Sequence, residues 1–172
     1  MAKKLVIVES PTKARTITKI LGSEFDVTSS MGHVRDLPAS KLGVDVEHDF
    51  EPHYIVIQKR RKLAKQLQEE ARGREAIYLA PDPDREGEAI SWHLERLLRD
   101  DEAAQAKKAL AKQAKSKPKR PPAKGAARAR AKGANGRQIY RIVFHEITPQ
   151  AIREAVAHPQ QINLKKVDAQ QA

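Results

Sequence analysis

Four carboxylates in this sequence lie where they could share one metal ion. Asp82, Asp84 and Glu86 follow each other at two-residue spacing after the apolar run 76–80, and Glu9 follows the apolar run 5–8. Carboxylates in one crevice repel each other unless some are protonated or a cation joins them. All-oxygen ligands favour a hard ion such as Mg²⁺. The pattern predicts a Mg²⁺ site at these four residues, with favourable placement at a helix N-terminus as the alternative for Asp84 and Glu86.

Basic side chains accompany these carboxylates. Lys13 lies one turn into a predicted helix, where it can pair with Glu9 or reach a phosphate, and the backbone amides after Ser10 also suit a phosphate. His33 and Arg35 lie in the irregular stretch 31–53, and beside a carboxylate crevice they suit phosphodiester contacts. The alternative interpretation is that Lys13 is an ordinary exposed lysine and that His33 has a structural role only. The other histidines have no mutual metal-ligand spacing and are interpreted as structural: His48, His53, His93, His145 and His158.

The elements that must position these groups alternate between apolar strands and amphipathic helices. Continuous apolar strands indicate a parallel sheet buried on both faces, so we expect an α/β, doubly wound, Rossmann-like fold. In such a sheet ligands bind at the carboxyl ends of the strands, where Glu9 and Asp82 would meet. The patterns predict strands over 3–8, 25–30, 54–57, 76–80 and 139–144, and helices over 11–21, around 63–71, up to about 99, around 149–156 and from 163 onward.

The basic excess of the chain is concentrated in one segment. The 172 residues carry a net charge of +11, but 103–137 hold 12 of the 33 Lys and Arg and none of the 22 Asp and Glu. The remainder therefore has 21 basic and 22 acidic side chains, a net charge of −1. The segment is rich in Ala and lacks aromatics, so we predict that it is mostly disordered and attracts nucleic acid without sequence preference.

Several classes of protein and of active site are excluded by composition. The absence of Cys excludes disulfides, thiolate metal sites and a cysteine nucleophile, and it suits a reducing cytoplasm. The longest apolar run has five residues, 76–80, far below the roughly 20 of a membrane-spanning helix, so we expect no membrane partner. The three tyrosines lie in predicted strands and are interpreted as core or sheet-face residues: Tyr54, Tyr78 and Tyr140.

Four stretches of the sequence together resemble the Toprim domain of bacterial type IA DNA topoisomerases. They are residues 5–14, 32–38, 82–94 and 143–148, and they follow the order found in that family. The Toprim fold is shared by type IA and type II topoisomerases, bacterial primases and some nucleases. The first two stretches resemble topoisomerase I more closely than topoisomerase III.

The resemblance implies roles for individual residues. Asp82, Asp84 and Glu86 would form the Mg²⁺ site, with Glu9 beside it protonating the leaving 3′ oxygen and reversing that role on religation. Lys13 would orient Glu9 and the scissile phosphate. DNA near the cleavage point would be contacted by His33, Arg35 and Arg85, and His33 would count with Glu9 and Lys13 among the catalytic residues.

In the type IA family a tyrosine of a later domain is the nucleophile, so we expect this chain to be an N-terminal part that is inactive alone. The expected Toprim domain comprises 1–102 and 138–160, with 103–137 as an insertion and 161–172 leading to the next domain. Expected partners are single-stranded regions of negatively supercoiled DNA and the remaining domains of a monomeric parent enzyme. Two alternatives stay open: a free-standing Toprim nuclease or primase-like protein, and a non-enzymatic nucleic-acid-binding module.

Overall fold

The computed structural model describes residues 4–38, 43–45, 47, 51–115 and 137–171, and its centre is a four-stranded parallel sheet. The strand order is β2-β1-β7-β8. Val8 pairs with Ser29 and Ile7 with Leu79, so the carboxyl ends of the strands share one edge. The predicted α/β fold is confirmed. The strands are β1 (Lys4–Val8), β2 (Phe25–Ser29), β7 (Ala76–Leu79) and β8 (Gln138–Arg141).

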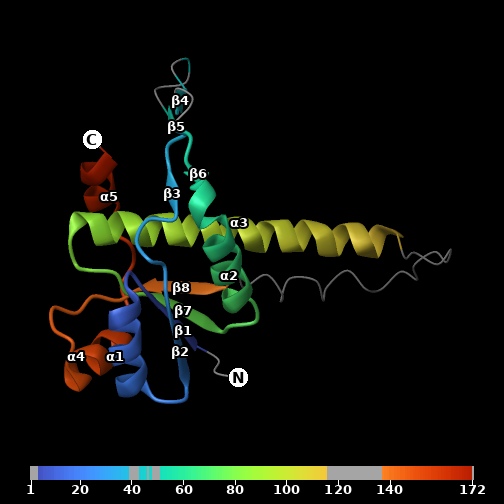
Figure 1. The fold of residues 1–172 in the computed structure, drawn as a ribbon. Coiled ribbons are helices and arrows are strands. Elements are labelled where there is room, and N and C mark those ends of the chain that lie inside the picture. The colour runs from blue at the N-terminus through green and yellow to red at the C-terminus, as the bar shows by residue number, and fades with distance from the viewer. Residues whose placement is uncertain (1–3, 39–42, 46, 48–50, 116–136, 172) are drawn as a thin grey trace, which may run out of the picture.

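Helices cover both faces of this sheet, as Figure 1 shows. Successive side chains of a strand point to opposite faces. Leu5 and Ile7 of β1 therefore enter the core beneath α2 and α3, whereas Val6 and Val8 enter the core beneath α1 and α4. The helix α5 packs against α3. The helices are α1 (Pro11–Leu21), α2 (Arg61–Ala71), α3 (Arg85–Lys115), α4 (Pro149–Ala157) and α5 (Leu164–Gln171).

The stretch between β2 and α2 forms small sheets of its own. β3 (Arg35–Asp36) pairs antiparallel with β6 (Ile55–Val56), and β4 (Val44–Asp45) pairs with β5 (Glu51–Pro52). A short 3₁₀ helix, Gln58–Arg60, leads into α2. The strand predicted over 54–57 is thus shorter and lies outside the main sheet, and Tyr54 precedes it. Ile55 is 48% exposed, and only Val56 of this strand packs against the core.

The helix α3 runs well past its predicted end near residue 99 and reaches Lys115. Residues 103–115 are therefore helical where the sequence predicted disorder, while 116–136 lie outside the described residues. Ala, Lys and Gln dominate this part of α3 and are strong helix formers, so it stays helical with little packing. No helix in the described part of the chain is long and apolar enough to cross a membrane.

Candidate active site

The strand order puts the expected ligand position of such a sheet between the carboxyl ends of β1 and β7, and we call this place the crevice. The connection that leaves β1 leads to β2 on one side, and the connection that leaves β7 leads to β8 on the other, which makes the β1/β7 boundary the topological switch point where such sheets bind ligands. The amide of Ala80 donates to the carbonyl of Ile7 at 2.8 Å, so the strands stay paired up to this edge. Glu9 leaves β1 here and Asp82 leaves β7 here, as predicted.

Lys13 joins the two carboxylates across the crevice. Ser10 caps α1 by accepting from the amide of Lys13 at 3.3 Å, with Pro11 in the first helical turn, which fixes Lys13 above the end of β1. The Lys13 ammonium donates to Glu9 Oε1 and to Asp82 Oδ1. Partial burial lowers the pKa of Lys13, but the hydrogen bonds and charges of Asp82 and Glu9 outweigh it and raise the pKa above its ordinary value.

The second oxygen of Glu9 tests whether this edge suits a cation. Glu9 Oε2 is buried and has no hydrogen-bond partner within the part of the chain that the structure describes. A buried carboxylate oxygen without a partner is costly, and a proton, a water or a cation would satisfy it. The carboxylates of Asp82 and Asp84 are exposed at the same edge. Carboxylate oxygen, the donor type at this edge, is the one that a hard ion such as Mg²⁺ prefers.

Asp84 and Glu86 point to different partners. Asp84 Oδ1 accepts from the amide of Gly87 at 2.6 Å and so caps α3, while Glu86 Oε1 lies 3.5 Å from His33 Nε2. Among the described residues no three His, Asp or Glu side chains gather closely enough to hold an ion. The structure thus brings Glu9 and Asp82 together through Lys13 and leaves the other two carboxylates apart from them.

A close approach of backbone determines how α3 begins. A Cβ added at Gly87 would collide with the carbonyl oxygen of Asp82. Only a residue without a side chain lets the turn 81–84 fold back over the first turn of α3. We call residues 81–84 the acidic turn. Arg85, which follows it, is exposed to solvent beside Glu86.

A second turn brings His33 to the same edge. Met31 and Gly32 both have positive φ, 52° and 86°, a conformation that favours glycine. The amide of Gly32 donates to the carbonyl of Glu9 at 3.0 Å, which ties this turn to the end of β1. His33 is thereby directed toward α3 and Glu86.

A cavity of about 380 Å³ adjoins His33. His33, Arg35, Tyr54 and His93 line it, together with Asp36 and Gln170. Arg35 Nη1 and His93 Nδ1 are buried and accept or donate no hydrogen bond among the described atoms. Burial lowers the pKa of His93 to about 4, helped by the charges of Arg35 and His33, so this ring is neutral at neutral pH. His93 packs edge-on against Tyr54, consistent with its structural interpretation.

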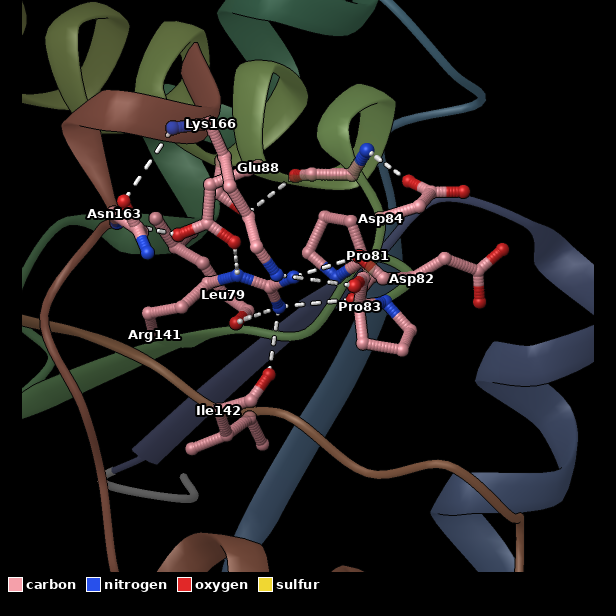
Figure 2. A network of polar contacts seen from close by, with 12 residues as sticks. Leu79, Pro81, Asp82, Pro83, Asp84, Glu88, Arg141, Ile142, Asn163 and Lys166 are labelled. Carbon is pink, nitrogen blue, oxygen red and sulfur yellow. Dashed lines mark hydrogen bonds and ion pairs between the residues drawn. The ribbon is translucent and has the colours of Figure 1, made fainter. Parts of the chain in front are cut away.

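Two residues that the sequence analysis did not single out hold the acidic turn from behind. Arg141 of β8 is 1% exposed and donates to the carbonyls of Pro81 at 2.9 Å and Asp82 at 2.7 Å. Its Nε donates to Glu88 Oε2 at 3.1 Å, and Glu88 Oε1 accepts from the amide of Asn163 at 2.6 Å. Figure 2 shows the guanidinium on one side of the turn and the carboxylates of Asp82 and Asp84 pointing away from it.

A charged residue inside an apolar strand is the signal that could have identified this pair. Arg141 interrupts the run of Ile139, Tyr140 and Ile142, and Glu88 lies among the buried residues of the first turn of α3. Burial lowers the pKa of Arg141 below its ordinary value. The carboxylates of Glu88 and of the more distant Glu9 and Asp82 act in the opposite direction but do not outweigh burial. Buried charges persist in proteins when they are paired and hydrogen-bonded, and this pair is both.

Comparison with known proteins identifies the family. The family model described as the Toprim domain matches residues 4–116, about two thirds of the chain. This chain belongs to the Toprim domain family. The crystal structure of full-length topoisomerase I from Thermotoga maritima is similar to it, with 41% sequence identity and a TM-score of 0.69. That match covers 96% of this chain and 22% of the Thermotoga maritima protein, and it confirms the resemblance drawn from the sequence.

Proposed function

We propose that this Toprim domain serves a type IA DNA topoisomerase, where it supplies acid–base and Mg²⁺-binding groups for transient cleavage of one DNA strand. The observation that carries the proposal is the contact of Lys13 with Glu9 and Asp82 at the β1/β7 crevice. The 41% identity to a topoisomerase I supports it. Because the chain spans 22% of that protein, the relaxation reaction and its tyrosine nucleophile are assigned to a parent enzyme.

Each side chain of the crevice has a task in this proposal. Glu9, held by Lys13 at one oxygen, gives a proton to the leaving 3′ oxygen during cleavage and takes it back during religation. Lys13 holds Glu9 in place and presents its ammonium to the scissile phosphate. Asp82, Asp84 and Glu86 would hold Mg²⁺, which requires the side chains of Asp84 and Glu86 to turn away from Gly87 and His33, their partners in this structure. When bound, the ion neutralises and positions the phosphate.

Groups next to the crevice would bind the DNA strand in this proposal. At the start of α1, Pro11 has no amide hydrogen and the amide of Lys13 donates to Ser10, so the amide of Thr12 is the one offered to a phosphate next to Glu9. His33 and Arg35 at the neighbouring cavity contact the strand, and Arg85 reaches it from the exposed start of α3. The partner is single-stranded DNA within negatively supercoiled DNA, and the enzyme acts as a cytoplasmic monomer together with its remaining domains.

A chimera tests this proposal. The matching part of the Thermotoga maritima enzyme is replaced by this chain, and relaxation of negatively supercoiled plasmid is measured with and without Mg²⁺. We expect Mg²⁺-dependent relaxation that Glu9→Gln lowers by about 100-fold or more, in line with the loss of a general acid. A chimera that relaxes plasmid equally well with Glu9→Gln would contradict the role of Glu9.

The chain alone is the second arm of this experiment. We expect no relaxation from it, because an acidic crevice without a nucleophilic tyrosine forms no covalent intermediate. Mg²⁺-dependent nicking of plasmid by the chain alone would favour a free-standing nuclease. Binding without any cleavage, in the chimera as in the chain, would favour a non-enzymatic binding module.

A further inference from the structure

Arg141 donates more hydrogen bonds to the region of the acidic turn than any other described side chain, although it never faces the crevice. Its guanidinium reaches four carbonyl oxygens and one carboxylate. The carbonyls belong to Leu79, Pro81, Asp82 and Ile142, at 2.6–3.2 Å. Three of them lie in the path from the end of β7 through the acidic turn, so one planar group fixes the direction in which that backbone leaves the sheet.

The proline residues of the turn reduce the number of hydrogen bonds that its backbone can donate. Pro81 and Pro83 have no amide hydrogen, so they cannot donate a hydrogen bond to a neighbouring strand or helix. The carbonyls of Pro81 and Asp82 instead accept from Arg141. The third carbonyl of the turn, Pro83, accepts from Lys166 Nζ of α5 at 3.4 Å.

Glu88 extends the network to α5. One carboxylate oxygen of Glu88 accepts from Arg141 and the other accepts from the backbone amide of Asn163, directly before α5. Glu88 is 3% exposed, so both oxygens are satisfied inside the protein. The start of α5 and the backbone of the acidic turn are therefore joined through two buried side chains, as Figure 2 shows.

We propose that Arg141 is a positioning residue for the acidic turn: through its carbonyl hydrogen bonds it fixes the backbone that carries Asp82 at the crevice and Asp84 at the start of α3, and through Glu88 it makes that placement depend on the docking of α5. The proposal concerns geometry behind the carboxylates, not contact with substrate. Groups that orient metal-ligating side chains change metal affinity or activity by about 10- to 100-fold when they are removed.

Four variants of the chain separate positioning from simple stability. Arg141→Met removes all the donors, and Arg141→Lys keeps the charge beside Glu88 but loses the planar fork. The double variant Glu88→Leu/Arg141→Met removes both charges and fills the site with apolar atoms, a replacement that commonly preserves stability. Arg72→Met is the matched control, because it breaks a bidentate pair with Asp101 between α2 and α3, away from the turn.

Two readouts are measured on each variant, beside its melting temperature. The first is Mg²⁺ affinity from amide shifts of residues 82–88, which rests on the proposed function. The second is hydrogen exchange of the Gly87 amide, which reports the Asp84 cap and needs no metal. For Arg141→Met we expect Mg²⁺ affinity to fall about 10-fold or more and Gly87 exchange to rise about 10-fold. For Arg141→Lys, both the Mg²⁺ affinity and the Gly87 exchange rate should lie between the values of Arg141→Met and the wild type.

The double variant Glu88→Leu/Arg141→Met shows whether Arg141 positions the turn or only stabilises the fold. We expect it to melt near the wild type while Mg²⁺ binding and Gly87 protection stay about 10-fold impaired, whereas Arg72→Met changes both by less than about twofold. A folded double variant with wild-type Mg²⁺ affinity and Gly87 exchange would overturn the proposal. If Arg141→Met does not fold, the double variant and Arg141→Lys are judged by the same criteria. If the wild type shows no Mg²⁺ response at 82–88, the proposed metal site fails, and Gly87 exchange alone decides the role of Arg141.

Discussion

The ammonium of Lys13 in the first turns of α1 donates to the carboxylate of Asp82, 69 residues later in the chain. Glu9 accepts from the same ammonium, so a single cation occupies the space between the two carboxylates at the β1/β7 crevice. Lys13 thus takes the position of a counter-ion for a pair that would otherwise repel. A metal ion that binds Asp82 must compete with it, and this competition leads to the first prediction.

Replacing Lys13 with Met should raise the Mg²⁺ affinity of the chain. Removing one competing charge from a partly exposed pair is worth about 1 kcal/mol, or roughly fivefold in affinity. Isothermal titration or amide shifts would measure it, with Lys19→Met, an exposed lysine of the same helix, as the control. In the chimera the same variant should relax plasmid more slowly. An unchanged or weaker Mg²⁺ affinity would show that Lys13 does not compete for this site.

His93 should make folding stability depend on pH. Its pKa is lowered from 6.5 to about 4 in the folded protein, so between these values the unfolded chain binds the extra proton. Its contribution is therefore fully present above pH 6.5 and is lost as the pH falls toward 4. The loss amounts to about 2 kcal/mol between roughly pH 7 and pH 5. Denaturant unfolding of the wild type and of His93→Phe should differ by this amount in their pH dependence, and parallel curves would refute the assignment.

Gly87→Ala should distort the acidic turn. The added methyl collides with the carbonyl of Asp82, so α3 or the turn must shift, at a cost of about 1 to 3 kcal/mol. Gly73→Ala adds the same methyl where no described atom lies within 4 Å, at a positive φ of 73°, and should cost about 1 kcal/mol. Amide spectra should change around residues 80–90 only in Gly87→Ala. Equal melting temperatures and unchanged turn signals in both variants would contradict the close packing.

Residues 117–136, the part of the basic segment 103–137 that follows α3, should dominate DNA binding by the isolated chain. Seven Lys and Arg lie in residues 117–136, and each phosphate neutralised adds about 0.7 to the log–log salt slope on single strands. Because not all of them engage at once, deleting 117–136 should reduce the magnitude of this negative slope by about 2 to 4. The melting temperature should change by only about a few degrees. Full affinity and slope after deletion would show that the folded domain carries the binding.

The sequence predicted the parts of this site that depend on local pattern. Apolar runs ending at Val8 and Ala80 indicate parallel strands, and their shared edge explains why Glu9 and Asp82 meet. The Lys13 contact with Asp82 was not foreseen, because only the fold brings α1 across to the end of β7. Which of the four carboxylates share an ion stays a prediction.

Other features were missed for identifiable physical reasons. Arg141 was taken as one more residue of a strand, since pairing with Glu88 is decided by packing between β8 and α3. The length of α3 was underestimated because an Ala- and Lys-rich composition is typical both of disordered segments and of solvated helices. The strand around residues 54–57 was assigned to the main sheet because short apolar runs do not reveal their partners.

A Mg²⁺ titration of the wild-type chain followed by backbone amide shifts tests the central claim most directly. We predict that the shifts concentrate at residues 82–88 and around Glu9, with a midpoint of about 1 mM or weaker, because part of the coordination awaits a phosphate. Asp84→Asn should weaken the response, whereas Asp168→Asn, an exposed carboxylate of α5, should leave it unchanged. Shifts that cluster elsewhere, or that persist in full in Asp84→Asn, would contradict a metal site at this crevice.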